Sequence, residues 1–323
     1  MKKVAIVFTG GTITMKTLDP NKGAFPMQDP SEIIHALNTN LGFDNLVTLH
    51  HSMIPSPSMT PESMRVLKTV IDPLLDDPEI AGVVITHGTD TLEETAFYLD
   101  MVHTSKKPVI VTGAMKNASE LGYDGFTNLV SSIYVALSED SKDKGVLVVM
   151  NYEIHAASEV TKMHTLNVNT FQSLSFGPLG VIDASDVIYY RTMNKHRYQF
   201  ANKLIDHIPL VKTYTGMDVS LLDYYLSQKV NGLVIEAMGR GNVPPEMVQG
   251  IQAFTNLNLP VLITSRVPSG RVFGTYGYDG GGKDLLNKGV ILAGDLSGLK
   301  ARLFLMVALG NQLDLDAIKA HLR

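Results

Sequence analysis

The sequence predicts an α/β protein with a larger N-terminal parallel-sheet domain, helices on both faces of that sheet, and a smaller C-terminal α/β domain. Three observations lead to this prediction. The chain has 323 residues, more than one ordinary core usually holds. Short runs of β-branched residues alternate with longer segments of helical pattern, which indicates right-handed βαβ units. The first runs are apolar on both faces, as are strands inside a parallel sheet.

The N-terminal domain is expected to comprise residues 1–188. Its strands are predicted at Val4–Phe8, Gly82–Thr86, Pro108–Thr112 and Gly145–Met150. Its helices are predicted at Ser31–Leu37, Pro61–Leu75, Thr91–Val102 and Phe126–Leu137. In such sheets ligands bind outside the carboxyl ends of the strands, so we expect the functional site there.

Residues 189–212 are polar, basic and aromatic without a clear period, and we interpret them as a linker. The C-terminal domain is expected at residues 213–323. Its strands are predicted at Gly232–Glu236, Pro260–Thr264 and Val290–Ala293. Its helices are predicted at Ser220–Gln228, Pro245–Asn256 and Gly298–Leu309.

The composition argues against several classes of protein and site. A formal net charge of −5 argues against nucleic-acid binding, which requires a basic face. The chain contains no cysteine, so it has no disulfide or thiolate nucleophile, and a reducing compartment is compatible with it. The ten histidines show no metal-binding spacing. We therefore expect neither a bound metal nor a nucleic-acid partner.

The N-terminus, MKKVAIVFTGG, has five apolar residues in a row, whereas a secretory leader needs roughly 7–15. We interpret this stretch as the first strand. No window approaches the roughly 18 continuous apolar residues of a membrane span. We therefore expect a cytoplasmic protein without a membrane partner.

The first predicted strand runs into Gly10-Gly11-Thr12. This turn lacks the second and third glycines of a dinucleotide-binding fingerprint. The nearest approach to a phosphate loop, Gly277–Lys283, is followed by Asp284 where a magnesium-binding Ser or Thr is needed. Two interpretations of the first turn remain at this point: a tight turn that needs positive φ, or a turn that exposes the Thr12 hydroxyl.

Thr89 and Asp90 lie between a buried strand and a helix in the stretch VVITHGTDTLEETAFYL. The spacing of Thr91 and Glu94 predicts a capping box. Thr89 and Asp90 then precede a helix N-terminus, where backbone N–H groups favour an anion. Asp90 also has a simpler interpretation as the helix N-cap. His87 is expected to be packed or hydrogen-bonded rather than to bind a ligand.

Lys162 lies in the polar stretch EVTKMHT, after the fourth predicted strand. A lone lysine is usually solvated. A lysine buried near an aspartate can instead act as a base, because desolvation lowers its pKa. A hydroxyl, an aspartate and a lysine together could then activate a threonine.

The order of these motifs resembles that of bacterial-type L-asparaginases over nearly the whole chain. The matching stretches are Thr9–Ile13, Thr86–Thr91, Thr112–Met115, Asp124-Gly125, Asn128-Leu129, Gly145–Asn151, Thr161-Lys162, Phe176–Gly180, Ser265–Pro268 and Lys300–Arg302. The resemblance implies a two-domain hydrolase that cleaves the side-chain amide of asparagine through an acyl-threonine intermediate, without a cofactor. It also favours the interpretation in which the first turn exposes Thr12.

The resemblance implies catalytic roles for four residues. Thr12 matches the primary nucleophile of the family. Thr89, Asp90 and Lys162 match a second group, which positions and activates the attacking water or hydroxyl.

Substrate contacts and assembly are implied in the same way. Ser56, together with Thr89 and Asp90, matches the residues that hold the α-carboxylate and α-amino groups. Ala114 matches a backbone contact to the amide, and Asn242 matches a residue supplied by a neighbouring subunit. The implied substrate is the small molecule L-asparagine, with L-glutamine as a weaker one. The implied assembly is a homotetramer built of intimate dimers.

The chain departs from the family at a tyrosine that others carry on a mobile loop after the nucleophile. Its first tyrosine is Tyr98, and the loop, Asp19–Pro26, offers Phe25, which cannot donate a hydrogen bond. We expect Tyr276, or as a second choice Tyr278, to supply this hydroxyl from a neighbouring subunit. The alternative is that both tyrosines are ordinary surface or interface residues.

A second departure is the absence of the glutamate that the partner subunit usually contributes. Asp279 is expected to replace it. Two other functions stay open: the same chemistry on glutamine or on an amidated tRNA-linked residue, and a non-catalytic amino-acid-binding protein. Ammonia release from asparagine distinguishes the catalytic from the non-catalytic possibility.

Overall fold

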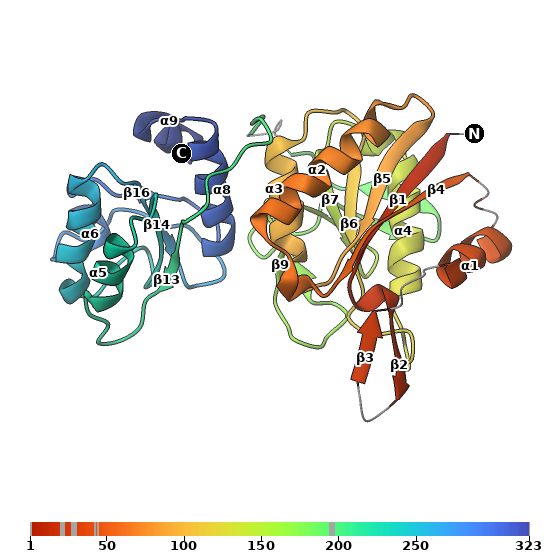
Figure 1. The fold of residues 1–323 in the computed structure, drawn as a ribbon, viewed down its shortest axis with the longest axis horizontal. Coiled ribbons are helices and arrows are strands. Elements are labelled where there is room, and N and C mark those ends of the chain that lie inside the picture. Colours follow the sequence, from red (N-terminus) through yellow and green to blue (C-terminus); the bar gives the residue numbers. More distant parts are fainter. Residues whose placement is uncertain are drawn as a thin grey trace. The chain divides into compact units, whose positions relative to one another are not determined.

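The computed structural model describes residues 2–19, 23–26, 31–41, 43, 45–193 and 198–322, and the statements below concern these residues. The chain divides into two compact units, Met1–Gln199 and Phe200–Arg323, which are described separately (Figure 1). The segment 189–212, expected as a linker, contains the last residue of strand β12 (Asp186–Tyr189) and all of strand β13 (Leu210–Lys212).

The first unit is built on an eight-stranded sheet with the strand order β12-β11-β8-β7-β6-β5-β1-β4. Its other strands are β1 (Lys3–Gly10), β4 (Leu46–Ile54), β5 (Ile80–Thr86), β6 (Val109–Thr112), β7 (Val146–Met150), β8 (Glu153–Ala156) and β11 (Gly180–Asp183). The pairs from β4 to β7 are parallel, which confirms the predicted parallel core.

Antiparallel strands that the sequence did not indicate extend this core through β8, β11 and β12. The chain reverses after β7 at Asn151 and Tyr152, whose φ angles are 50° and 63°. Two consecutive residues with positive φ form the tight turn that joins antiparallel neighbours. The sheet is therefore mixed, although it is mostly parallel.

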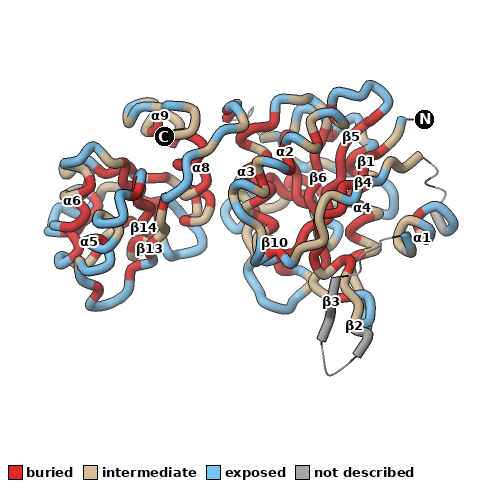
Figure 2. The backbone as a smooth tube through the Cα atoms, viewed as in Figure 1, coloured by how far each residue is buried: buried red, intermediate tan, exposed pale blue. Residues whose placement is uncertain are grey.

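Helices cover both faces of the sheet. Helix α2 (Pro61–Asp76) contacts β5, and α3 (Leu92–Val102) contacts β6 and β7. Helix α4 (Gly125–Leu137) packs on the other face, where its Leu129 and Ile133 join a buried cluster with alternate residues of the central strands (Figure 1). Leu37 of α1 (Ser31–Leu41) belongs to the same cluster. Figure 2 shows that the central strands are buried along their length.

Strand β4, which ends shortly before Ser56, was not among the predicted strands. Its sequence, LVTLHHSMI, mixes apolar and polar residues, and most of them are only half-buried because β4 lies at the sheet edge. Edge strands bury less apolar surface, so their sequence signal is weaker. β4 pairs with β1 so that Gly10 lies beside Ile54, and this register places Ser56 next to the end of β1.

A hairpin of β2 (Met15–Asp19) and β3 (Gly23–Pro26) occupies the region expected as a loop. Residues 20–22 and the side chain of Phe25 lie outside the described residues.

The second unit contains a four-stranded parallel sheet with the order β13-β14-β15-β16. Its remaining elements are α5 (Ser220–Ser227), β14 (Leu233–Ala237), α6 (Val248–Asn256), β15 (Val261–Ser265), α7 (Gly282–Asn287), β16 (Ile291–Leu292), α8 (Gly298–Gly310) and α9 (Leu315–His321). The predicted α/β character of this domain is confirmed, whereas β13, α7 and α9 were not predicted.

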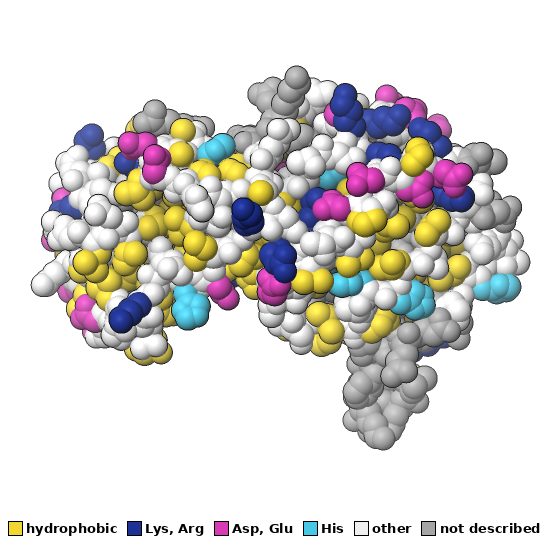
Figure 3. All heavy atoms as spheres, turned by 45° about the horizontal axis from the view of Figure 1, so that its top comes forward, with side chains coloured by type: hydrophobic (Ala, Val, Ile, Leu, Met, Phe, Trp, Pro, Cys, Tyr) yellow, Lys and Arg dark blue, Asp and Glu magenta, His cyan; other side chains and the backbone are white. Residues whose placement is uncertain are grey.

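Within the described part of the chain, no helix combines the length and the apolar character needed to cross a bilayer. On the face shown in Figure 3, the Lys and Arg side chains are interspersed with Asp and Glu.

Candidate active site

Two glycines at the end of β1 bring this strand into close contact with its neighbours. Gly10 and Gly11 have φ angles of 106° and 85°, which favour glycine. A Cβ on Gly10 would lie 2.5 Å from the carbonyl oxygen of Ile54, and a Cβ on Gly11 would lie 2.4 Å from the nitrogen of Gly88. Both the φ angles and the close approach require glycine, so the interpretation of this stretch as a turn that needs positive φ is confirmed.

Thr12 begins a short 3₁₀ turn (Thr12–Thr14) directly after these glycines. The Thr14 N–H closes the turn by donating to the Gly11 carbonyl at 3.0 Å. Thr12 is half-buried, and its hydroxyl forms no hydrogen bond with any residue that the structure describes. Gly11 directly precedes Thr12, and Gly88 directly precedes Thr89. These two glycines are in contact with each other.

The loops after β4, β5 and β6 meet at the same edge of the sheet. A Cβ on Gly88 would lie 2.6 Å from the Ser56 hydroxyl oxygen. A Cβ on Gly113 would lie 2.5 Å from the His87 carbonyl oxygen and 3.3 Å from Cγ2 of Thr89. Glycine at each contact lets the strand ends converge, because any side chain there would hold them apart.

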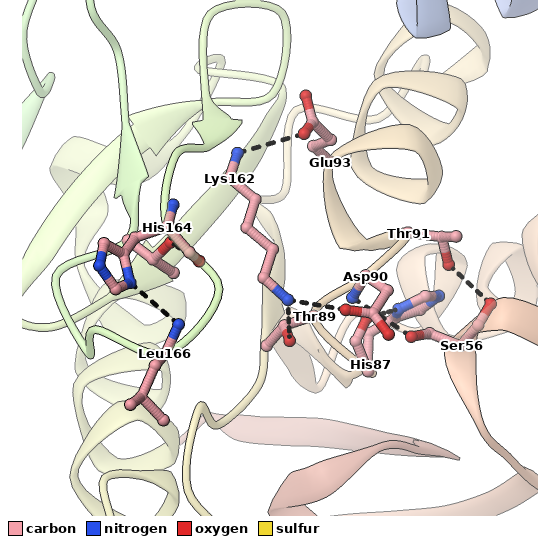
Figure 4. A network of polar contacts seen from close by, with 11 residues as sticks. Ser56, His87, Thr89, Asp90, Thr91, Glu93, Lys162, His164 and Leu166 are labelled. Atoms are coloured by element: carbon pink, nitrogen blue, oxygen red, sulfur yellow. Dashed lines mark hydrogen bonds and ion pairs between the residues drawn. The ribbon is translucent and has the colours of Figure 1, made fainter.

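Lys162 lies on the short strand β9 (Thr161–Lys162), and its side chain points toward Thr89 and Asp90 in the loop after β5 (Figure 4). Its Nζ donates to the Thr89 hydroxyl oxygen at 2.9 Å and to Oδ1 of Asp90 at 2.7 Å. The Lys162 side chain is 17% exposed, whereas that of Asp90 is 61% exposed. The expected contact of a partly buried lysine with Asp90 and Thr89 is confirmed, and the interpretation of Lys162 as a solvated lysine is wrong.

Glu93 of α3 fixes the backbone that carries this lysine. Its carboxylate accepts the Lys162 N–H and the Thr161 hydroxyl, each at 3.1 Å. Glu93 is 5% exposed, and β9 also pairs with β10 (Phe171–Gln172). The sequence analysis did not single out Glu93, because nothing local indicates that a residue of the helix start faces β9.

Helix α3 begins as expected after Thr91, but the predicted capping box is wrong. Thr91 is the N-cap, so the interpretation of Asp90 as N-cap is also wrong, and the Thr91 side chain makes no capping hydrogen bond. Its hydroxyl instead donates to the Ser56 carbonyl at 2.9 Å. The Asp90 N–H donates to the Ser56 hydroxyl oxygen at 3.3 Å. These bonds tie the turn after β4 to the loop after β5.

His87 is a buried, hydrogen-bonded residue, as expected. Its Nδ1–H donates to the Gly88 carbonyl at 2.8 Å, and its Nε2 lies 2.9 Å from the Thr95 hydroxyl. A carbonyl can only accept, so Nδ1 carries the proton and Nε2 accepts from Thr95. Burial lowers the pKa of His87 to about 4. The ring is therefore neutral near pH 7 and supports the loop without adding charge to it.

Ala114 follows Gly113 after β6 and is fully buried. The carboxylate of Asp124 accepts the N–H of the next residue, Met115, at 3.0 Å. The side-chain amide of Asn128 donates to the Gly113 carbonyl and to Oδ2 of Asp124, both at 3.0 Å. These bonds fix the backbone around Ala114, where a contact to the amide is expected.

Asn242, another expected site residue, belongs to the second unit. Its Oδ1 accepts the Gly282 N–H at 3.1 Å. The neighbouring Val243 N–H donates to the Gly280 carbonyl at 2.9 Å. Asn242 and Val243 therefore hold the glycine-rich stretch in a defined turn.

Tyr276, the last expected site residue, lies at the start of this stretch. Its ring stacks on that of Tyr278 with centroids 5.6 Å apart, and the two residues are 45% and 57% exposed. Asp279, the expected replacement for the family's glutamate, lies 3.7 Å from Nζ of Lys288. Its charge is thus partly neutralised within its own unit.

The stretch before Asp284 does not form a phosphate loop. The Gly280 N–H, which such a loop would offer to a phosphate, donates to Oδ2 of Asp284 at 3.0 Å. Asp284 also pairs with Lys288. Across the described ranges, no cluster of three or more His, Asp or Glu side chains could hold a metal ion.

Tyr123 is a further residue at the site that the sequence analysis did not single out. Its hydroxyl donates to the Ile13 carbonyl at 2.7 Å. Its ring lies against Gly125, where a Cβ would be 2.4 Å from the hydroxyl oxygen. The one available signal was its position directly before the Asp124-Gly125 motif.

Comparison with known families matches both units. Residues 3–195 match the family described as "Asparaginase, N-terminal", and residues 207–322 match the "Glutaminase/Asparaginase C-terminal domain".

Individual L-asparaginases are also similar to this chain over nearly its whole length. The chain is 35% identical over 311 residues to an L-asparaginase of Bacillus licheniformis, with 96% of each chain covered. It is also 35% identical to a probable L-asparaginase of Deinococcus radiodurans, over 96% of this chain and 93% of that one. The crystal structure of a probable cytoplasmic L-asparaginase from Campylobacter jejuni superposes with a TM-score of 0.87 at 29% identity, covering 100% and 99% of the two chains.

Proposed function

This chain belongs to the asparaginase family, and on that premise we propose that it hydrolyses the side-chain amide of L-asparagine to L-aspartate and ammonia. Thr12 is the proposed nucleophile. Its hydroxyl attacks the amide carbon, the C–N bond breaks, and ammonia leaves with the proton that Thr12 gave up. Water then attacks the resulting acyl-threonine ester, which releases L-aspartate and restores the hydroxyl. The Thr12 hydroxyl, in the turn after β1, has no hydrogen-bond partner among the described residues, which supports this role.

Thr89, Asp90 and Lys162 form the proposed second catalytic group. Nζ of Lys162 lies 2.9 Å from the Thr89 hydroxyl oxygen, within the distance at which a proton can pass between them. Proton removal from Thr89 would activate it toward the attacking hydroxyl or water. Asp90, 2.7 Å from Nζ, orients the lysine.

Ser56, Thr89 and Asp90 are proposed to hold the α-carboxylate and the α-ammonium group of the substrate. Asp90 uses Oδ1 for Lys162 and is largely exposed, so its other oxygen is available to an ammonium group. The backbone of Ala114 would contact the amide. With the α groups fixed, the additional methylene of L-glutamine would displace its amide from Thr12, so we expect weaker activity on L-glutamine.

The observation that carries this proposal is the convergence of two threonines and a Lys–Asp pair at one edge of the sheet. Coupled ammonia assays with L-asparagine, L-glutamine and D-asparagine test it. We expect ammonia and L-aspartate in equal amounts from L-asparagine, and slower release from L-glutamine. Binding of L-asparagine without ammonia release would indicate a non-catalytic amino-acid-binding protein. Faster release from L-glutamine would identify a glutaminase.

We expect activity to require assembly, with a homotetramer of intimate dimers as the proposed form. Val267, Phe273, Tyr276 and Tyr278 of the second unit are each at least 45% exposed. Exposed apolar side chains gathered in one segment are typical of protein–protein interfaces. Asn242 and Tyr276 are proposed to complete a neighbouring protomer's site. On dilution, specific activity should fall together with the oligomer mass measured by light scattering, and a fully active monomer would contradict this prediction.

A neighbouring subunit is also proposed to supply the hydroxyl that assists Thr12. Tyr276→Phe removes only this hydroxyl, and we expect kcat to fall by about 10²-fold, as for loss of a general acid–base group. Tyr278→Phe tests the second choice, and Tyr224→Phe, at a tyrosine 55% exposed in the same unit, is the matched control. If the Tyr276 and Tyr278 variants both keep kcat within about twofold of wild type, well under 1 kcal/mol of barrier, the trans-hydroxyl proposal is wrong.

A cytoplasmic location is part of the proposal. The absence of cysteine is compatible with a reducing compartment, and the superposed Campylobacter structure is that of a probable cytoplasmic enzyme. Cell fractionation of the native host, with activity followed in each fraction, would test the location.

A further inference from the structure

We propose that Tyr123 is a positioning residue, which holds the nucleophile's turn through its hydrogen bond to the Ile13 carbonyl. This inference rests on the proposed function of Thr12. The Tyr123 hydroxyl and the Ile13 oxygen are 2.7 Å apart and join residues 110 positions apart in the sequence. Ile13 directly follows Thr12 in the turn Thr12–Thr14. The Tyr123 side chain, which lies outside this turn, therefore bonds to the turn's backbone.

The bond acts on the geometry of the turn through the peptide unit between Ile13 and Thr14. The carbonyl of this unit accepts from Tyr123, and its N–H donates to the Gly11 carbonyl at 3.0 Å. Hydrogen bonds in such a chain polarise and strengthen one another. Tyr123 therefore reinforces the bond that closes the turn around Thr12, and so limits the directions in which the Thr12 hydroxyl can point.

Tyr123 is itself held in place as a donor. Its ring lies on Gly125, where the absence of a Cβ makes room for it. Asp124, between these two residues, is fixed by the Met115 N–H and the Asn128 amide. Burial, together with the nearby charge of Asp124, raises the pKa of Tyr123 well above its usual value. The hydroxyl thus keeps its proton and donates throughout the physiological range.

A second bond in the same region provides the matched control. The Ser119 hydroxyl oxygen accepts the Thr17 N–H at 3.0 Å. The segment between β6 and α4, which contains both Ser119 and Tyr123, thus also bonds to β2, after the Thr12–Thr14 turn. Ser119→Ala removes a hydrogen bond between the same two segments without touching the peptide unit next to Thr12. A general contribution to loop packing would be shared by both residues, whereas a positioning role belongs to Tyr123 alone.

The test compares Tyr123→Phe and Ser119→Ala with the wild-type oligomer. We expect Tyr123→Phe to lower kcat for L-asparagine about tenfold while KM stays within about twofold and the melting temperature stays within about 3 °C. Ser119→Ala should keep kcat within about twofold. The Thr14 amide should exchange with deuterium faster in Tyr123→Phe alone, a measurement that does not depend on activity.

These readouts separate the possible failures. A wild-type protein that releases no ammonia overturns the proposed function, whereas the amide exchange still shows whether Tyr123 holds the turn. An unchanged kcat in Tyr123→Phe, or unchanged Thr14 exchange, overturns the positioning role. A Tyr123→Phe variant that fails to fold, or equal losses of kcat in both variants, assigns Tyr123 to general packing and overturns it as well.

Discussion

Thr12→Ala is expected to lower kcat for L-asparagine by at least about 10³-fold, as loss of a nucleophile typically does. The side chain lies in a turn whose backbone is fixed by Gly10, Gly11 and the Thr14 N–H, so the substitution should remove the hydroxyl without moving the backbone. Removing a hydroxyl that has no hydrogen-bond partner among the described residues should cost little stability. KM should therefore change much less than kcat.

Steady-state kinetics on the folded oligomer, together with the melting temperature, provide the measurement. Thr12→Ser keeps a hydroxyl at the same position and should retain far more activity than Thr12→Ala. Intact-protein mass spectrometry after acid quenching should show an aspartyl adduct on wild type and none on Thr12→Ala. Near-normal turnover by Thr12→Ala would show that another residue is the nucleophile.

Lys162→Met is expected to reduce kcat by about 10³-fold, the order found for loss of a positioned acid–base group. Methionine keeps the unbranched apolar part of the chain but removes Nζ, which donates to both Thr89 and Asp90. Asp90 is 61% exposed, so water can solvate the carboxylate that loses its partner. We therefore expect the protein to stay folded and to bind L-asparagine.

Two further variants sharpen this experiment. Lys162→Arg keeps a positive charge beside Asp90 but cannot lose a proton at working pH, so it should stay inactive if Lys162 acts as a base. Lys142→Met removes a lysine from a surface ion pair with Glu139 and should leave kcat unchanged. Full activity in Lys162→Met would limit Lys162 to a structural role, and recovery in Lys162→Arg would show that charge alone is sufficient.

Features that depend only on residues close together in the chain could be predicted from the sequence. Buried strands such as Ile80–Thr86 are apolar on both faces, and this local pattern predicted the parallel core. Gly10-Gly11 indicated a positive-φ turn as one of two interpretations, because glycine adopts such angles readily, and the structure has positive φ at both residues. The order of the motifs predicted the family, and with it Thr12, Thr89, Asp90 and Lys162 as candidates for one site.

Contacts between residues far apart in the chain became known from the three-dimensional fold. The residues of edge strand β4 are mostly half-buried, so its apolar pattern is weak and it was missed, although its register with β1 brings Ser56 next to the end of that strand. The Thr91 hydroxyl donates to the Ser56 carbonyl and accepts no capping hydrogen bond from its own helix, a choice that depends on how the two loops pack. Tyr123 reaches Ile13 across 110 residues, and such a contact exists only once the sheet has brought both segments together.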